Sequence, residues 1–154
     1  MGMVTSFIRL RSEELAKLID DPAGLDEFLW RDREEPSGYV DKAIDGIQFL
    51  LSAAGVPVYL APLEMPGEPI ENGRGDIYFG LSTAQVAEIA AHLAATPFDE
   101  LAAHFDAEAM NAQQVYPMAW NADDTEYLQN NYEKLVRFFA DAAARNGAVL
   151  MASG

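Results

Sequence analysis

The chain is 154 residues long, 50% of them hydrophobic and 10% aromatic, and it carries a formal net charge of −15. This composition is typical of one folded domain with a full hydrophobic core, and it excludes a disordered chain. Because there is no cysteine, a disulfide framework, a thiolate nucleophile and cysteine-based metal sites are excluded as well.

In the first third of the chain, the pattern predicts a strand over residues 3–10. A helix is expected to start at Ser12, where a capping residue is followed by two glutamates. A second, short helix is expected over 25–30, and the charged segment 31–38 is expected to be an exposed loop.

The most hydrophobic helix candidate covers residues 41–54, and a glycine and a proline directly after it supply the expected stop. Its few polar residues recur at intervals of four, three and four, so they form one narrow stripe on an otherwise buried helix. The stripe consists of Asp41, Asp45, Gln48 and Ser52. Residues 56–75 hold four prolines and three glycines, which predict a long irregular connection.

The second half of the chain is dominated by helices. A strand is expected over 76–80, and a capping box that begins at Ser82 opens a helix. Two short helices follow it. The helix over 123–145 is the clearest of all, because its apolar residues recur at helical spacing, and residues 148–151 are expected to form a final buried strand.

These elements predict a single domain over residues 1–154 with a helix-rich α+β fold. We expect a small central sheet of about three to four strands, covered by five or six helices. The sheet is expected to contain the N-terminal strand, the strand near Ile77 and the C-terminal strand. The longest uncharged stretch, 46–63, is interrupted by two prolines, so we expect no membrane span. With no secretory signal visible either, we expect a cytoplasmic protein.

The negative charge is concentrated in one interval. Between Arg74 and Lys134 there is neither Lys nor Arg. The acids of this interval are Asp76, Glu88, Asp99, Glu100, Asp106, Glu108, Asp123, Asp124, Glu126 and Glu133. Such a surface repels nucleic acid and attracts a basic protein. The leading hypothesis is therefore a non-enzymatic binding protein that recognises a basic protein partner, of the inhibitor or immunity type.

Three carboxylates are candidates for catalysis. Asp41 and Asp45 stand one helical turn apart on a mostly buried helix, where desolvation would raise at least one pKa. Asp76 follows the sequence Gly-Arg-Gly, in which Arg74 is a candidate for binding an anion. With a divalent cation these residues would form a carboxylate-based hydrolase, which is the alternative function. A helix cap at Asp41, the rim of the core at Asp45 and a turn at Arg74 explain the same residues without a site.

Tyr116 and Trp120 are candidates for a ligand-binding pocket, because aromatic residues in loops are enriched in binding sites. Packing in the core is the alternative explanation. His92 and His104 lack the spacing of a metal site, so no metal or cofactor is expected. The chain is expected to be a monomer or a homodimer, and in the latter case the apolar loop 56–63 would form the interface.

Three stretches of the sequence have a familiar order: MGMV at 1–4, DKAIDGIQFLL at 41–51, and the block from LSTAQV at 81–86 through YPMAW at 116–120. Over nearly its whole length the chain resembles the YfbM-like family of bacterial proteins, a domain family of unknown function. The resemblance implies a single mixed α/β domain from the bacterial cytoplasm. It carries over no catalytic residue.

Overall fold

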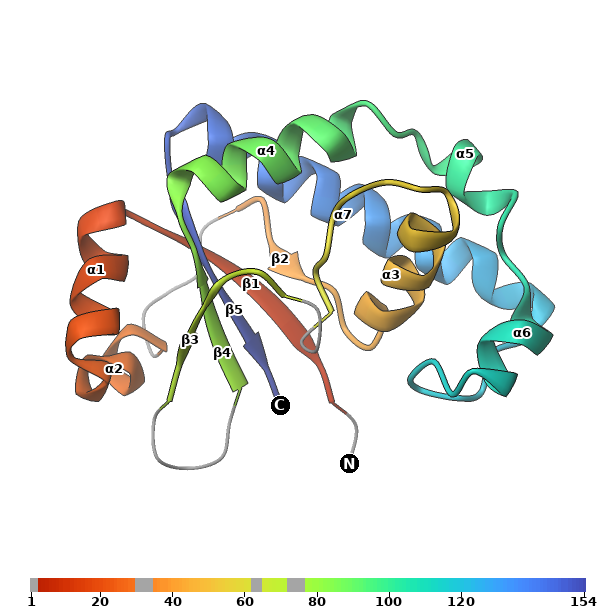
Figure 1. Cartoon of the computed structure of the whole chain (residues 1–154), viewed down its shortest axis with the longest axis horizontal. Coiled ribbons are helices and arrows are strands. Elements are labelled where there is room, and N and C mark those ends of the chain that lie inside the picture. The colour runs from red at the N-terminus through yellow and green to blue at the C-terminus, as the bar shows by residue number, and fades with distance from the viewer. Residues whose placement is uncertain (1–2, 30–34, 62–64, 72–76) are drawn as a thin grey trace.

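The computed structural model describes residues 3–29, 35–61, 65–71 and 77–154 (Figure 1). Its centre is a five-stranded antiparallel sheet in the order β2-β1-β5-β4-β3. The strands are β1 (Thr5–Leu10), β2 (Gly38–Tyr39), β3 (Glu68–Ile70), β4 (Ile77–Leu81) and β5 (Ala148–Ser153). The mixed fold class is confirmed, and the three strands expected from the sequence lie side by side in the middle of the sheet.

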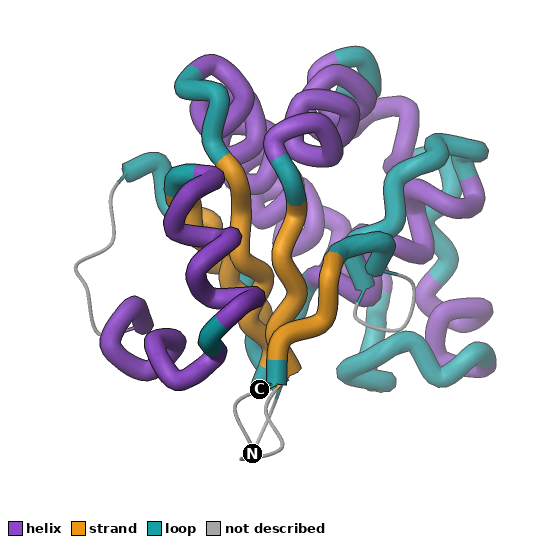
Figure 2. Tube along the Cα trace, turned by 60° about the vertical axis from the view of Figure 1, so that its left-hand side comes forward, coloured by secondary structure: helices purple, strands orange, loops and turns teal. Residues whose placement is uncertain are grey.

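Helices cover both faces of this sheet (Figure 2). The described residues form seven α-helices, of which α1 (Ser12–Asp20) and α2 (Leu25–Leu29) lie on one face. On the other face lie α3 (Ile44–Ala53), α4 (Thr83–Ala94) and α7 (Thr125–Ala144). The short helices α5 (Phe98–Ala102) and α6 (Ala107–Ala112) connect α4 to α7, and the 3₁₀ turns η1 (Pro22–Gly24) and η2 (Ala122–Asp124) precede α2 and α7. Within the described ranges, no helix has both the length and the apolar character of a membrane span.

The expected number of three to four strands is corrected to five by two short edge strands. β2 has two residues and begins at the last residue of the segment expected as a loop, and β3 lies inside the expected irregular connection. Pro69 in β3 is compatible with an edge position, where the missing N–H need not join the ladder. Both strands are too short for an alternating apolar pattern, so the sequence gives no sign of them.

The sheet is buried on both faces, and β5 shows why. Val149 and Met151 point into the larger core beneath α3, α4 and α7, whereas Ala148 and Leu150 point into the smaller core beneath α1 and α2. Successive side chains of a strand point to opposite faces. The sequence of a strand that is covered on both faces is therefore a continuous run of apolar residues.

Helix α7 carries the predicted apolar stripe, and its members Leu128, Tyr132, Leu135, Phe139 and Ala142 are all buried. The hydroxyl of Tyr132 donates a hydrogen bond to the carbonyl oxygen of Thr96 at 2.7 Å, and its ring centre lies 5.9 Å from that of Phe98. Burial raises the pKa of Tyr132 to about 12, so the hydroxyl stays a donor at neutral pH. These contacts fix the start of α5 against α7.

The polar stripe of α3 holds the loop that follows the helix. The side chain of Gln48 is buried, and it donates to the carbonyl oxygen of Val58 at 2.9 Å and accepts from the amide of Leu60 at 2.6 Å. Val58, Leu60 and Ala61 are consequently buried in their own chain. The homodimer stays a prediction, but these three residues are not free to form its interface.

Replacing Gln48 by leucine should lower the free energy of unfolding by about 2–4 kcal/mol, because the buried groups of Val58 and Leu60 lose their partners. Ser52, which only accepts a bond from Gln48 at 3.1 Å and is exposed, is the matched control, and its change to alanine should cost about 0.5 kcal/mol or less. Urea unfolding of the two variants measures the difference. Equal losses would show that Gln48 does not anchor the loop.

Candidate functional site

The structure places the predicted site residues in different surroundings. Arg74 and Asp76 lie outside the described residues. Asp45 is half-buried in the first turn of α3, as expected for a residue at the rim of the core. Of the remaining three, Asp41 lies just before α3, Trp120 packs against Gly46 of that helix, and Tyr116 is bound to Met3.

Asp41 is not a helix cap, because α3 starts at Ile44 and Asp41 has a left-handed backbone with φ of 51°. Aspartate tolerates this conformation better than most residues do. Its carboxylate accepts hydrogen bonds from the hydroxyls of Tyr127 at 2.7 Å and Tyr39 at 3.1 Å. Its carbonyl oxygen accepts from the amide of Thr5 at 2.9 Å. The side chain thereby joins β2 to the first turn of α7.

The hydrogen bond from Tyr127 holds the pKa of the Asp41 carboxyl below its ordinary value, and the Tyr39 hydroxyl adds to this effect. Burial, followed by the bond to Asp41, raises the pKa of Tyr127. The rise in pKa expected from desolvation is therefore wrong for Asp41. At neutral pH the Asp41 carboxyl is therefore ionised and does not serve as a general acid.

Trp120 belongs to the core, so the alternative explanation given for it above is correct. Its indole Nε1 donates to the carbonyl oxygen of Val115 at 2.9 Å, and the residue is 6% exposed. A Cβ atom at Gly46 of α3 would lie 2.6 Å from Cη2 of Trp120. The helix therefore needs glycine at this position for the indole to pack against it.

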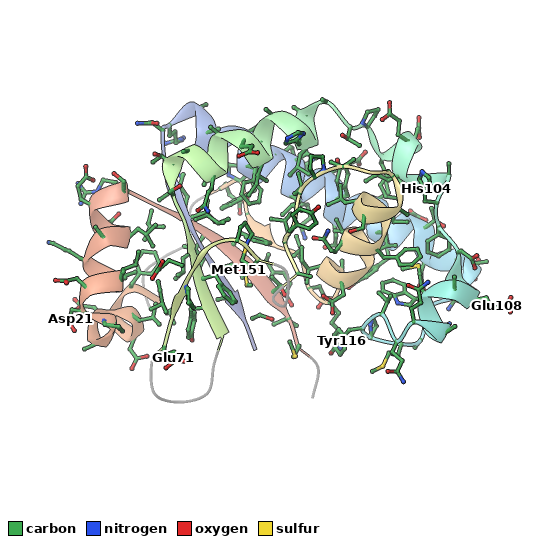
Figure 3. All side chains as sticks on the ribbon, in the orientation of Figure 1. Asp21, Glu71, His104, Glu108, Tyr116 and Met151 are labelled. Carbon is green, nitrogen blue, oxygen red and sulfur yellow. The ribbon has the colours of Figure 1, made fainter. Side chains whose placement is uncertain are left out.

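Tyr116 is half-buried in the loop between α6 and α7, and its hydroxyl accepts a bond from the amide of Met3 at 2.6 Å (Figure 3). Two residues further along the loop, Met118 is 54% exposed and has a left-handed φ of 64°. Met118 is not among the candidate residues expected from the sequence. No pattern in the sequence marks it, because both its exposure and its backbone conformation arise from the folding of the loop.

One hollow in the described part of the chain has a volume of about 910 Å³ and lies between β1, β2, the start of α1 and the end of α7, and a second, smaller one lies at the sheet. Three of the residues that line the larger hollow are Arg9, Arg11 and Arg145. The smaller, of about 230 Å³, is lined by Val4, Ser6, Tyr78, Ala152, Ser153 and Gly154. None of the predicted site residues that the structure describes lines either hollow.

The exposed acids of α5, α6, η2 and α7 form what we call the acidic face, at the end of the molecule away from α1 and α2 (Figure 1). Its members are Asp99, Glu100, Asp106, Glu108, Asp123, Glu126 and Glu133. Within the described ranges, ion pairs join Arg9, Arg11 and Arg145 to Asp141 or Glu14, and none involves the acidic face. The arginines of the described ion pairs thus lie outside the acidic face, whose acids form none of these pairs.

The catalytic alternative gains no support from the part of the chain that the structure describes. In that part, no three His, Asp or Glu side chains gather closely enough to hold a metal ion. Because Asp76 and Arg74 lie outside it, the carboxylate-based hydrolase stays a prediction.

Comparison with known proteins identifies the family. Residues 1–152 match the family described as a domain of unknown function, DUF1877. The chain belongs to the DUF1877 family. The crystal structure of YfbM from Escherichia coli, a protein of unknown function, is similar with a TM-score of 0.73 and 17% sequence identity, covering 98% of this chain and 99% of that one. This confirms the YfbM-like resemblance, and at such identity it shows the fold alone. No curated protein matches the chain.

In this DUF1877 protein, replacing Tyr127 by phenylalanine should raise the pKa of Asp41 toward its ordinary value, because the strongest donor to the carboxylate is lost. A lowered native pKa stabilises the fold above the unfolded pKa of about 3.9, and that contribution disappears as the pH falls through the native value. The variant should therefore be about 1 kcal/mol less stable at neutral pH, with a smaller difference in acid. Carbon NMR titration of Asp41 and unfolding at several pH values measure both effects, and an unchanged pKa would contradict the assignment.

Proposed function

We propose that this DUF1877 protein is a non-enzymatic binding protein whose acidic face holds a basic protein partner, of the inhibitor or immunity type. The observation that carries the proposal is the separation of charge in the fold. The described arginines that form ion pairs do so with Asp141 and Glu14, outside the acidic face. The carboxylates of the face have no such neutralising partner among the described residues.

An uncompensated surface of one sign acts over a distance of about 10 Å at ordinary ionic strength. It speeds the encounter with a partner of opposite charge and penalises partners of the same charge. Nucleic acids and anionic membranes are therefore unfavourable ligands for the acidic face. A protein with clustered lysines and arginines is the favourable one.

The acids of the acidic face are carried by rigid elements. Rigidity favours tight association, because little conformational entropy is lost on binding. Phe98 at the start of α5 packs against Tyr132 of α7, and Asp106 caps α6 by accepting a bond from the amide of Ala109 at 3.0 Å. Glu108 and His104 extend from this end of the molecule (Figure 3). His104 is exposed there as well.

A pair of charge variants tests the proposal. One removes four charges from the acidic face, with Glu100→Gln, Glu108→Gln, Asp123→Asn and Glu126→Gln. The other removes four exposed acids elsewhere, with Glu13→Gln, Asp20→Asn, Glu27→Gln and Glu68→Gln. Both have the same net charge, so they differ only in where the charge is lost.

Partner proteins retained from bacterial lysate at low salt are to be identified, purified and titrated against the three proteins. The face variant should bind roughly 10-fold more weakly, with a shallower dependence on salt, whereas the control should stay within about 2-fold of the unmodified protein. Binding that is insensitive to salt, or weakened equally in both variants, would contradict a specific acidic face.

A further inference from the structure

We infer that Met118, in the same turn as Tyr116, is the apolar anchor of the acidic face, and that it receives an apolar side chain from a basic segment of the partner. The hydroxyl of Tyr116 accepts a hydrogen bond from the amide of Met3 at 2.6 Å, and the amide of Met118 closes the turn by donating to the carbonyl oxygen of Val115 at 2.8 Å. This inference rests on the proposed function and names the feature of the partner that the face recognises.

The backbone of Met118 is the first observation that points to a role at the surface. A side chain with a Cβ atom loses roughly 1–2 kcal/mol in the left-handed region, and Met118 has a φ of 64° there. Burial does not offset this cost, because the side chain is 54% exposed. The other described non-glycine residues with positive φ are Asp41, Gln114 and Asn146, which are polar. Met118 alone among them exposes an apolar side chain.

The second observation is that the loop is held rigidly. The side chain of Asn111 donates to the carbonyl oxygen of Trp120 at 2.8 Å and accepts from the amide of Trp120 at 2.8 Å. The indole of Trp120 in turn binds the carbonyl oxygen of Val115 at 2.9 Å and packs over Gly46. Met118 is thus presented on a preorganised turn, and rigid apolar anchors are typical of the residues that dominate binding energy.

The charges around the loop decide which occupant fits. The loop is preceded by α6 with Glu108 and followed by η2 with Asp123 and by Glu126 of α7, all exposed members of the acidic face. An apolar side chain flanked by lysines or arginines matches both the methionine and the acids of the elements that flank its loop. A second copy would bring two acidic faces together, and an anionic lipid surface would be repelled. The flexible thioether of methionine adapts to varied apolar partners.

Two lysine-rich peptides that differ at one central position, Leu in one and Ser in the other, provide the test. Fluorescence anisotropy at low salt should show the Leu peptide binding the unmodified protein roughly 10-fold more tightly than the Ser peptide. In Met118→Gly this ratio should fall to about 1–2, while the salt-dependent binding common to both peptides remains.

The variant Met118→Gly distinguishes a loss of binding from a loss of stability. Because it relieves the left-handed backbone, Met118→Gly should unfold at the same or a higher temperature than the unmodified protein. Asn146→Gly is the matched control, since Asn146 has a φ of 51° and is exposed after α7, in the lining of the larger hollow. It changes the backbone in the same way and should leave the peptide ratio unaltered.

Any of the following results would overturn the inference. Equal binding of the Leu and Ser peptides by the unmodified protein, or an unchanged ratio in Met118→Gly, overturns the anchor and leaves the proposed function intact. Failure of both peptides to bind at low salt overturns the proposed function as well. Self-association in light scattering, or binding to vesicles containing phosphatidylglycerol, that is lost in Met118→Gly would assign the anchor to a second copy or to lipid instead.

Discussion

Strand β5 pairs with β1 along its whole length and with β4 on its other edge, and the remaining elements take their places from this pairing. The register pairs Thr5 with Ser153, so the first and last strands of the chain lie side by side in the middle of the sheet. With apolar side chains on both faces, β5 requires a helical layer on each side. The chain meets that requirement with α1 and α2 on one face and α3, α4 and α7 on the other.

The same topology exposes the acids of one interval of the sequence at one end of the molecule. The interval without lysine or arginine is mostly helical, running from α4 through α5 and α6 to the first part of α7. These helices bury their apolar stripes and expose their acids, and α5 is fastened to α7 by Phe98 and Tyr132. The arginines of the described ion pairs, by contrast, lie on β1, beside α1 and after α7. Charge separated along the chain is thereby separated in space.

The first turn of α7 and the loop before it are fixed from two sides. Tyr127 binds the carboxylate of Asp41, and Trp120 packs over Gly46 of α3. Neither contact leaves a polar group of the tyrosine or the indole without a partner. This double attachment explains how a short loop keeps Met118 exposed in an unfavourable backbone conformation, since the surrounding structure determines it.

Local patterns in the sequence determined much of this protein: the capping box at Ser82 and the apolar stripe of α7 are both present as expected. Each depends on residues within a few positions of one another, so spacing alone reveals it. Only the tertiary structure decided the edge strands β2 and β3, which exist by pairing with longer neighbours. It also decided the role of Asp41, whose partner Tyr127 lies 86 residues away, and the exposure of Met118. These features rest on contacts between distant segments, which no short-range pattern encodes.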